Sequence, residues 1–147
     1  MTARADYALR AATVLASSGP GPMKSEAIAA AEDIPLRFLH HILGALTRAG
    51  ILSSLRGADG GYELARAPTV ITVADIIRAV EGPYAAGGGP EMREGSAAAR
   101  RGGNEALRAV WAVLRANERA VLESVTLADL ASGRLPDRST VGRLTDA

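Results

Sequence analysis

Residues 36–66 read LRFLHHILGALTRAGILSSLRGADGGYELAR, and this segment decides the fold class. In its first half, apolar residues recur every three or four positions, which predicts a helix that Pro35 opens and Gly50 closes. In its second half, ILSSL and YELA have strand composition and flank the turn-forming residues RGADGG, which predicts a β-hairpin over residues 51–65. We therefore expect a mainly α-helical protein with one small β-hairpin.

The sequence on either side of this segment predicts further helices. Residues 3–17 have helical spacing, and SGPGP then ends the helix. Ser25 is a candidate N-cap for a short second helix, and Thr72 and Thr126 are candidate N-caps for two later helices. Residues 104–124 carry apolar side chains at intervals of three and four, which predicts a long helix.

Helix, helix, turn, helix and hairpin is the element order of a winged helix-turn-helix. We expect that domain over residues 1–82. Residues 83–103 are rich in glycine and alanine without a sustained period, so we expect a flexible loop there. The long helix and a short terminal helix are expected over residues 104–131, followed by a polar tail over 132–147.

Composition narrows the possible functions of these 147 residues. The chain has no cysteine, which excludes disulfides, thiolate metal sites and cysteine nucleophiles. No stretch has the length and hydropathy of a membrane span, and the first residues carry Arg4, Asp6 and Arg10 without a signal-peptide pattern, so we expect a cytoplasmic protein. The net charge is only +1, so any interaction with nucleic acid must depend on where the charges lie.

The predicted helix after Pro35 has two different faces. Its apolar stripe, expected to pack on the first two helices, consists of Phe38, Leu39, Ile42, Leu43 and Leu46. The opposite face consists of Arg37, His40, His41, Gly44 and Arg48. Such a face fits the helix that reads DNA in the major groove, and it also fits an ordinary solvated helix surface. Adjacent histidines point about 100° apart on a helix, so the pair does not predict a metal site.

The hairpin tip places an arginine in a thin turn. Gly57, Gly60 and Gly61 are expected to allow positive φ angles, and Arg56 stands at the end of the first strand. A thin tip with an arginine suits the narrow, electronegative minor groove of DNA. The alternative is an ordinary glycine-rich hairpin in which Arg56 pairs with Asp59.

Four segments together resemble one family. ADYALR near the start, the whole of residues 36–66, ITVADIIRAVEGP and VTLADL are similar to the Rrf family of bacterial winged-helix transcriptional regulators, whose members include IscR, NsrR and CymR. The resemblance implies a homodimer that binds a partly palindromic double-stranded DNA operator, with the third helix in the major groove and Arg56 in the minor groove. It also implies that residues 104–124 form the dimer interface.

These expectations can be stated residue by residue. The residues expected to contact DNA are Arg4, Lys24, Ser25, Arg37, His40, His41, Gly44, Arg48, Ser54, Arg56, Gly57 and Gly60. The residues expected at the dimer interface are Leu107, Val110, Trp111, Leu114, Val121 and Leu122. Trp111 could instead belong to the core of its own chain or line a ligand pocket. Glu118 interrupts the apolar stripe, so we expect a polar break there, or an ion pair with Arg115 or with an arginine of the partner chain.

The chain also departs from the family pattern. Members that bind an iron–sulfur cluster carry three cysteines before the long helix, and IscR-like members add a histidine just inside it; by position, the last cysteine falls near Glu105 and the histidine at Arg108. Asp6 stands where some members supply a carboxylate ligand, but without thiolates we expect no cluster and no other cofactor. His40 and His41 replace a Glu-Gln pair of IscR, so the operator should differ.

The function expected from these observations is a DNA-binding transcriptional regulator, acting as a repressor and responding to a small molecule or a protein partner. The alternative is a winged-helix protein-interaction module that does not bind DNA. The sequence contains no Gly-x-Ser-x-Gly motif, no P-loop and no cluster of metal ligands, so we expect no catalytic residues and no enzymatic activity.

Overall fold

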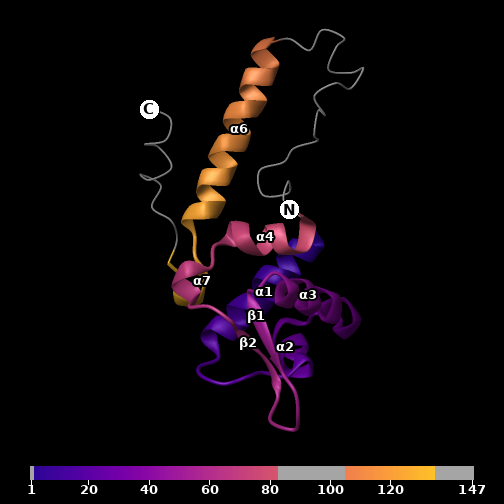
Figure 1. Ribbon diagram of the computed structural model, residues 1–147. Coiled ribbons are helices and arrows are strands. Elements are labelled where there is room, and N and C mark those ends of the chain that lie inside the picture. Colours follow the sequence, from indigo (N-terminus) through magenta and orange to yellow (C-terminus); the bar gives the residue numbers. More distant parts are fainter. Residues whose placement is uncertain (1, 83–104, 135–147) are drawn as a thin grey trace.

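A computed structural model describes residues 2–82 and 105–134 of the chain (Figure 1). The helices and strands in chain order are α1 (Ala3–Ser17), α2 (Ser25–Glu32), α3 (Leu36–Arg48), β1 (Leu52–Leu55), β2 (Gly61–Leu64), the 3-10 turn η1 (Pro68–Val70), α4 (Val73–Glu81), α6 (Glu105–Ser124) and α7 (Leu127–Ser132). The predicted class, mainly helical with one antiparallel hairpin, is confirmed. The predicted loop over 83–103 and most of the predicted tail lie outside the described residues.

The core is aliphatic and is built around α1. Four alanines of that helix, at positions 5, 8, 11 and 12, have no exposed surface, and such small side chains let neighbouring helices approach closely. Leu39, Leu43 and Leu46 of α3 and Ile76 of α4 fill the same core. Leu127 of α7 also belongs to it, so the end of the described chain packs with the beginning.

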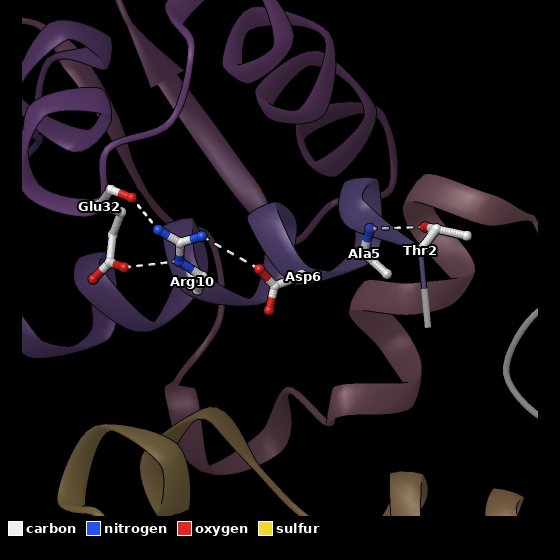
Figure 2. Close-up of polar contacts among 5 residues, drawn as sticks. All are labelled: Thr2, Ala5, Asp6, Arg10 and Glu32. Carbon is white, nitrogen blue, oxygen red and sulfur yellow. Dashed lines mark hydrogen bonds and ion pairs between the residues drawn. The ribbon is translucent and has the colours of Figure 1, made fainter.

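An arginine network joins α1 to the end of α2 (Figure 2). Arg10 of α1 donates a hydrogen bond from Nε to the Glu32 carboxylate at 3.0 Å and another to the Glu32 backbone carbonyl. The same guanidinium pairs with Asp6 at 3.3 Å and lies 5.6 Å from the centroid of the Tyr7 ring. These hydrogen bonds, first to Glu32 and then to Asp6, raise the pKa of Arg10 above its ordinary value. The contact joins the last residue of α2 to α1.

The hairpin is anchored to the segment that precedes α2. Its register pairs Leu52 with Leu64 and Leu55 with Gly61. On the other edge of β2, the N–H of Met23 donates to the carbonyl of Tyr62 and the N–H of Tyr62 donates to the carbonyl of Met23, both at 2.8 Å. The wing and the start of the helix-turn-helix are therefore hydrogen-bonded to each other.

Two similar sequences, ITVAD at 71–75 and VTLAD at 125–129, pair with each other. The Val73 N–H donates to the Val125 carbonyl and the Leu127 N–H donates to the Ile71 carbonyl, each at 2.9 Å. We call these paired segments, 71–73 and 125–127, the clasp. Figure 1 shows that α6 extends from the clasp away from the other helices, toward the end of the molecule opposite the hairpin.

Each half of the clasp begins a helix with a complete capping box. The Thr72 hydroxyl accepts from the Asp75 N–H at 3.1 Å, and the Asp75 carboxylate accepts from the Thr72 N–H at 3.0 Å. Thr126 and Asp129 repeat this arrangement at the start of α7. The predicted caps at Thr72 and Thr126 are thus confirmed. Beside the clasp, Arg78 of α4 forms an ion pair with Glu123 of α6 at 2.5 Å.

Two details of the prediction for the helices were wrong. Phe38 is not in the core: its surface is 60% exposed, whereas Ala45, which the predicted stripe did not include, is only 7% exposed. Ser25 is not the N-cap of α2: Lys24 has that position, without a side-chain hydrogen bond, and Ser25 is the first helical residue. Within the described ranges, no helix combines the length and the hydropathy that crossing a membrane requires.

Candidate nucleic-acid interface

The outward face of α3 carries cationic and titratable side chains. Arg37, His40, His41 and Arg48 are all exposed to solvent. Gly44 lies among them, and a Cβ added at this position would be 3.2 Å from Nη1 of Arg48. The guanidinium of Arg48 therefore lies over Gly44, and the absence of a side chain there gives this arginine room on its own helix. The face offers a phosphate or a base edge several donors within about three helical turns.

His40 is held by a hydrogen bond to the start of α2. Its Nε2 lies 3.2 Å from the Ser25 hydroxyl, which is also 3.2 Å from the Glu26 carboxylate. Which of the two groups donates in the contact between His40 and Ser25 depends on the tautomer of His40, and Nδ1 on the other side of the ring remains available to a base edge. The Glu26 backbone N–H and then the Ser25 hydroxyl, with smaller contributions from His40 and Lys24, lower the pKa of Glu26.

The tip of the wing is exposed from Ser54 to Asp59. No ion pair or hydrogen bond in the described part of the chain joins Arg56 to Asp59, so the alternative of an internal pair has no support. Gly57 has φ +103 and Gly61 has φ +146, as the turn prediction requires. Gly60 was expected to have a positive φ, but it does not. A glycine is required there for a different reason: a Cβ at this position would be 2.2 Å from the Leu55 carbonyl oxygen.

The outward face of α3 and the base of the wing are both hydrogen-bonded to the segment at the start of α2. His40 contacts Ser25, which lies two residues after Met23, and Met23 is hydrogen-bonded to Tyr62 of β2. Lys24 stands between them as the exposed N-cap of α2. Arg4 is exposed in the first turn of α1, and no hydrogen bond or ion pair among residues 2–82 joins it to α3 or to the hairpin.

Sequence reasoning placed Phe38 in the core, and the structure places it on the surface in the first turn of α3. Its position at the edge of the apolar stripe is the one signal that could have separated it from Leu39 and Leu43. Spacing alone does not show whether an edge position faces the core or the solvent.

The expected dimer residues on α6 divide into two groups. Leu107, Val110, Trp111 and Leu114 are between 46% and 53% exposed, and the unexpected Val113 is 56% exposed. Trp111 is therefore not a core residue of its own chain. Val121 is half-buried, and Leu122 packs against the core described above. No ion pair in residues 105–134 joins Glu118 to Arg115, so Glu118 interrupts the stripe as an exposed carboxylate.

A helix-turn-helix with a cationic second helix and an arginine-tipped wing defines the class of winged-helix DNA-binding transcriptional regulators. The chain belongs to the Rrf2 family: the family model described as "Iron-dependent Transcriptional regulator" matches residues 1–133. The family resemblance stated from the sequence is thereby confirmed.

Individual relatives agree with this assignment. A provisionally named helix-turn-helix transcriptional regulator of Mycobacterium tuberculosis (strain H37Rv) is 42% identical over 147 residues, which cover 99% of this chain and 88% of that protein. The structure of CymR, the global cysteine regulator of Bacillus subtilis, is 33% identical with a TM-score of 0.77, covering 90% of this chain and 96% of that one. IscR of T. potens is 28% identical with a TM-score of 0.73, covering 95% and 94%.

The family description names iron, and the residues of this chain do not fit an iron–sulfur cluster. Such clusters are held chiefly by cysteine thiolates, and the chain has no cysteine. The described residues contain no group of three or more histidine, cysteine, aspartate or glutamate side chains that could hold a metal ion. Asp6, the position that resembles a carboxylate ligand, is instead paired with Arg10.

Proposed function

We propose that this regulator is a homodimeric, sequence-specific repressor that binds a partly palindromic operator. In this proposal α3 lies in the major groove, and Arg37, His40, His41 and Arg48 contact bases and phosphates. Arg56 enters the adjacent minor groove from the tip of the wing. Arg4, Lys24, Ser25, Gly44, Ser54 and Gly57 complete the contact surface, chiefly along the phosphate backbone, whereas Gly60 is buried and only supports the turn.

One observation carries the proposal: the outward face of α3 is connected to the base of the wing. The hydrogen bond between His40 and Ser25 and the two hydrogen bonds between Met23 and Tyr62 join α3, α2 and β2. A recognition helix and a wing that move as one unit can engage neighbouring grooves together. The exposure of Arg37 and Arg56 supports the assignment of both elements to DNA.

The proposed dimer uses the apolar face of α6. Leu107, Val110, Trp111 and Leu114 form a stripe that the chain leaves half-exposed, and a second copy of α6 would bury it. Glu118 within that stripe would meet an arginine of the partner chain or mark the edge of the interface. Two recognition helices at a fixed separation would then match the two half-sites of an operator.

The signal that regulates the proposed repressor is a small molecule or a protein partner, since the chain lacks the thiolates for a cluster. Regulation means that the signal favours one of two dimer geometries, which differ in the separation of the recognition helices. As a DNA-bound regulator, the protein would act in the bacterial cytoplasm at the nucleoid.

The proposal is tested by selecting binding sites from a random duplex library with the full-length protein. We expect an enriched, partly palindromic sequence whose affinity, measured by fluorescence anisotropy, falls steeply with salt concentration. His40→Ala should change the preferred base at one position of each half-site. Equal weakening on every operator variant would remove His40 from base recognition. A library without any enriched sequence, or affinity that does not depend on salt, would favour the protein-interaction module instead.

A further inference from the structure

The chain's one phenylalanine is exposed at the point where the recognition helix begins. Phe38 is the third residue of α3, and its side chain is 60% exposed. In helix-turn-helix proteins, the N-terminal residues of the recognition helix are those that reach base edges. Burying a phenylalanine in the core stabilises a protein, and most of that stabilisation is lost when the side chain is left exposed.

Exposure alone does not give a residue a function, since single exposed apolar residues are common on protein surfaces. The surroundings of Phe38 are more informative. Arg37 precedes it and His41 stands one turn further along the same side of α3, and both are exposed. The exposed apolar neighbour on this helix is Leu36, at 37%. Leu36 and Phe38 point about 160° apart around the helix, so together they do not form the patch of several hundred Å² that a protein partner ordinarily covers.

Double-stranded DNA offers a partner that fits both features. Its phosphates match the arginines and histidines, and its major groove presents one apolar group, the C5-methyl of thymine. An exposed apolar side chain beside Arg37 and His41 is the complement of that methyl group within an anionic groove. Resting on the function proposed above, we infer that Phe38 is a specificity-determining residue that contacts a thymine methyl in each operator half-site, beside the base that His41 reaches.

The inference is tested with operators that differ by single methyl groups. After the operator has been selected with the full-length protein, each thymine of the half-sites is replaced in turn by deoxyuridine, which lacks only the methyl. We expect one thymine per half-site whose replacement weakens binding on the order of fourfold, and on the order of fifteenfold when both half-sites are changed. Affinity is measured by anisotropy at constant salt concentration.

The matched variants Phe38→Ala and Phe38→Leu assign the effect to this side chain. With Phe38→Ala, the same deoxyuridine operator should lose less than about twofold relative to the thymine operator. With Phe38→Leu, which keeps an apolar side chain, most of the discrimination should remain. Because both proteins are compared on the same two duplexes, any effect of deoxyuridine on DNA shape cancels. Phe38 is exposed, so the melting temperatures of the variants should stay close to that of the wild type.

Three results would overturn the inference in distinguishable ways. Wild-type binding that is indifferent to every deoxyuridine would mean that no thymine methyl is read. Equal sensitivity of the wild type and Phe38→Ala would assign the methyl contact to another residue. Failure to select any operator would contradict the proposed function itself, and the inference would fall with it.

Discussion

Gly61 is the wing residue at which both the backbone conformation and the lack of space exclude a side chain. Its φ of +146 lies where side chains are strained, and a Cβ there would be 2.5 Å from the Met23 carbonyl oxygen. That oxygen accepts the hydrogen bond from Tyr62 that anchors the hairpin to α2. Gly57, by contrast, has φ +103 and nothing within 4 Å of the place where a Cβ would stand.

We expect Gly61→Ala to lower the free energy of unfolding more than Gly57→Ala does. Gly57→Ala adds only backbone strain, about 1–3 kcal/mol, whereas Gly61→Ala adds similar strain and also forces Met23 away from β2. Urea unfolding of both variants measures the difference. Equal losses would mean that the contact between Met23 and β2 contributes little to stability.

Arg56→Ala should weaken operator binding by about 1–3 kcal/mol while leaving the oligomeric state unchanged. The reason is that the wing would lose its charge in the minor groove, and no ion pair within the described chain depends on Arg56. Anisotropy titrations at matched salt concentration measure the affinity, and Asp59→Ala serves as the control at the same tip. Unchanged affinity of Arg56→Ala would refute the minor-groove role.

Single residues were predicted correctly where local chemistry decides their environment. The exposure of Arg37 and Arg56 follows from charge, and the conformations of Gly57 and Gly61 follow from the turn they make. Phe38 was predicted wrongly because it lies at the edge of the helical stripe, where spacing alone does not show whether a side chain faces the core or the solvent.

At the scale of elements, the two threonine–aspartate capping boxes are the clearest link between sequence and structure. Thr72 and Thr126 each begin a helix, and their backbones also pair in the clasp. Each threonine therefore supports both its own helix and the attachment of α6 and α7 to α4.

Thr72→Ala and Thr126→Ala should each lower the free energy of unfolding by about 1 kcal/mol, because each removes an N-cap hydrogen bond. In the double variant we expect a total that differs from the sum of the two, since both caps stabilise the same clasp. Thermal or urea unfolding of the four proteins in this cycle measures the coupling. Strict additivity would show that the two helix starts are independent.

The cap at Asp129 also predicts a dependence on pH. The Thr126 backbone N–H and then the Thr126 hydroxyl lower the pKa of Asp129, so the ionised form stabilises the folded state. This stabilisation is complete above the unfolded pKa of about 4 and is lost as the pH falls through the lower folded value. Asp129→Asn should therefore be less stable than the wild type near pH 7, with a smaller difference near pH 3. A difference that is constant with pH in urea unfolding would contradict this.

The helices themselves were predicted well, because the signals that define a helix lie within a few residues of one another. These signals are the apolar periodicity, the capping residues and the helix-breaking residues. Pairings between distant segments were not predicted. Met23 and Tyr62 are 39 positions apart by their numbers, and nothing in either segment identifies its partner. The similarity of ITVAD and VTLAD was visible in the sequence, but their antiparallel pairing in the clasp was not.

For the whole molecule, the orientation of α6 is the decisive feature. It extends from the clasp away from the hairpin end (Figure 1). Leu107, Val110, Trp111 and Leu114 on this helix are about half-exposed. A face of this kind, at the end opposite the proposed DNA contacts, could join two copies without obstructing α3.

Leu114→Asp should dissociate the proposed dimer, because it places a charge in the middle of the apolar stripe. Ala112→Asp is the matched control, since it adds the same charge at an exposed position on another side of α6. Sedimentation velocity over a concentration series measures the fraction of dimer. A monomeric wild type, or equal effects of the two substitutions, would contradict the proposed interface.

The burial of Leu127 in the core has a consequence for truncated forms of this chain. Although Leu127 follows the long α6 helix, it fills space beside Ile71 and α1, and its N–H bonds to the Ile71 carbonyl. A truncated polypeptide that stops at Gly82 would keep every residue proposed to contact DNA. It would lose Leu127, a side chain that is buried in the core. The proposed DNA-binding part and α7, the last described helix, therefore share one hydrophobic core.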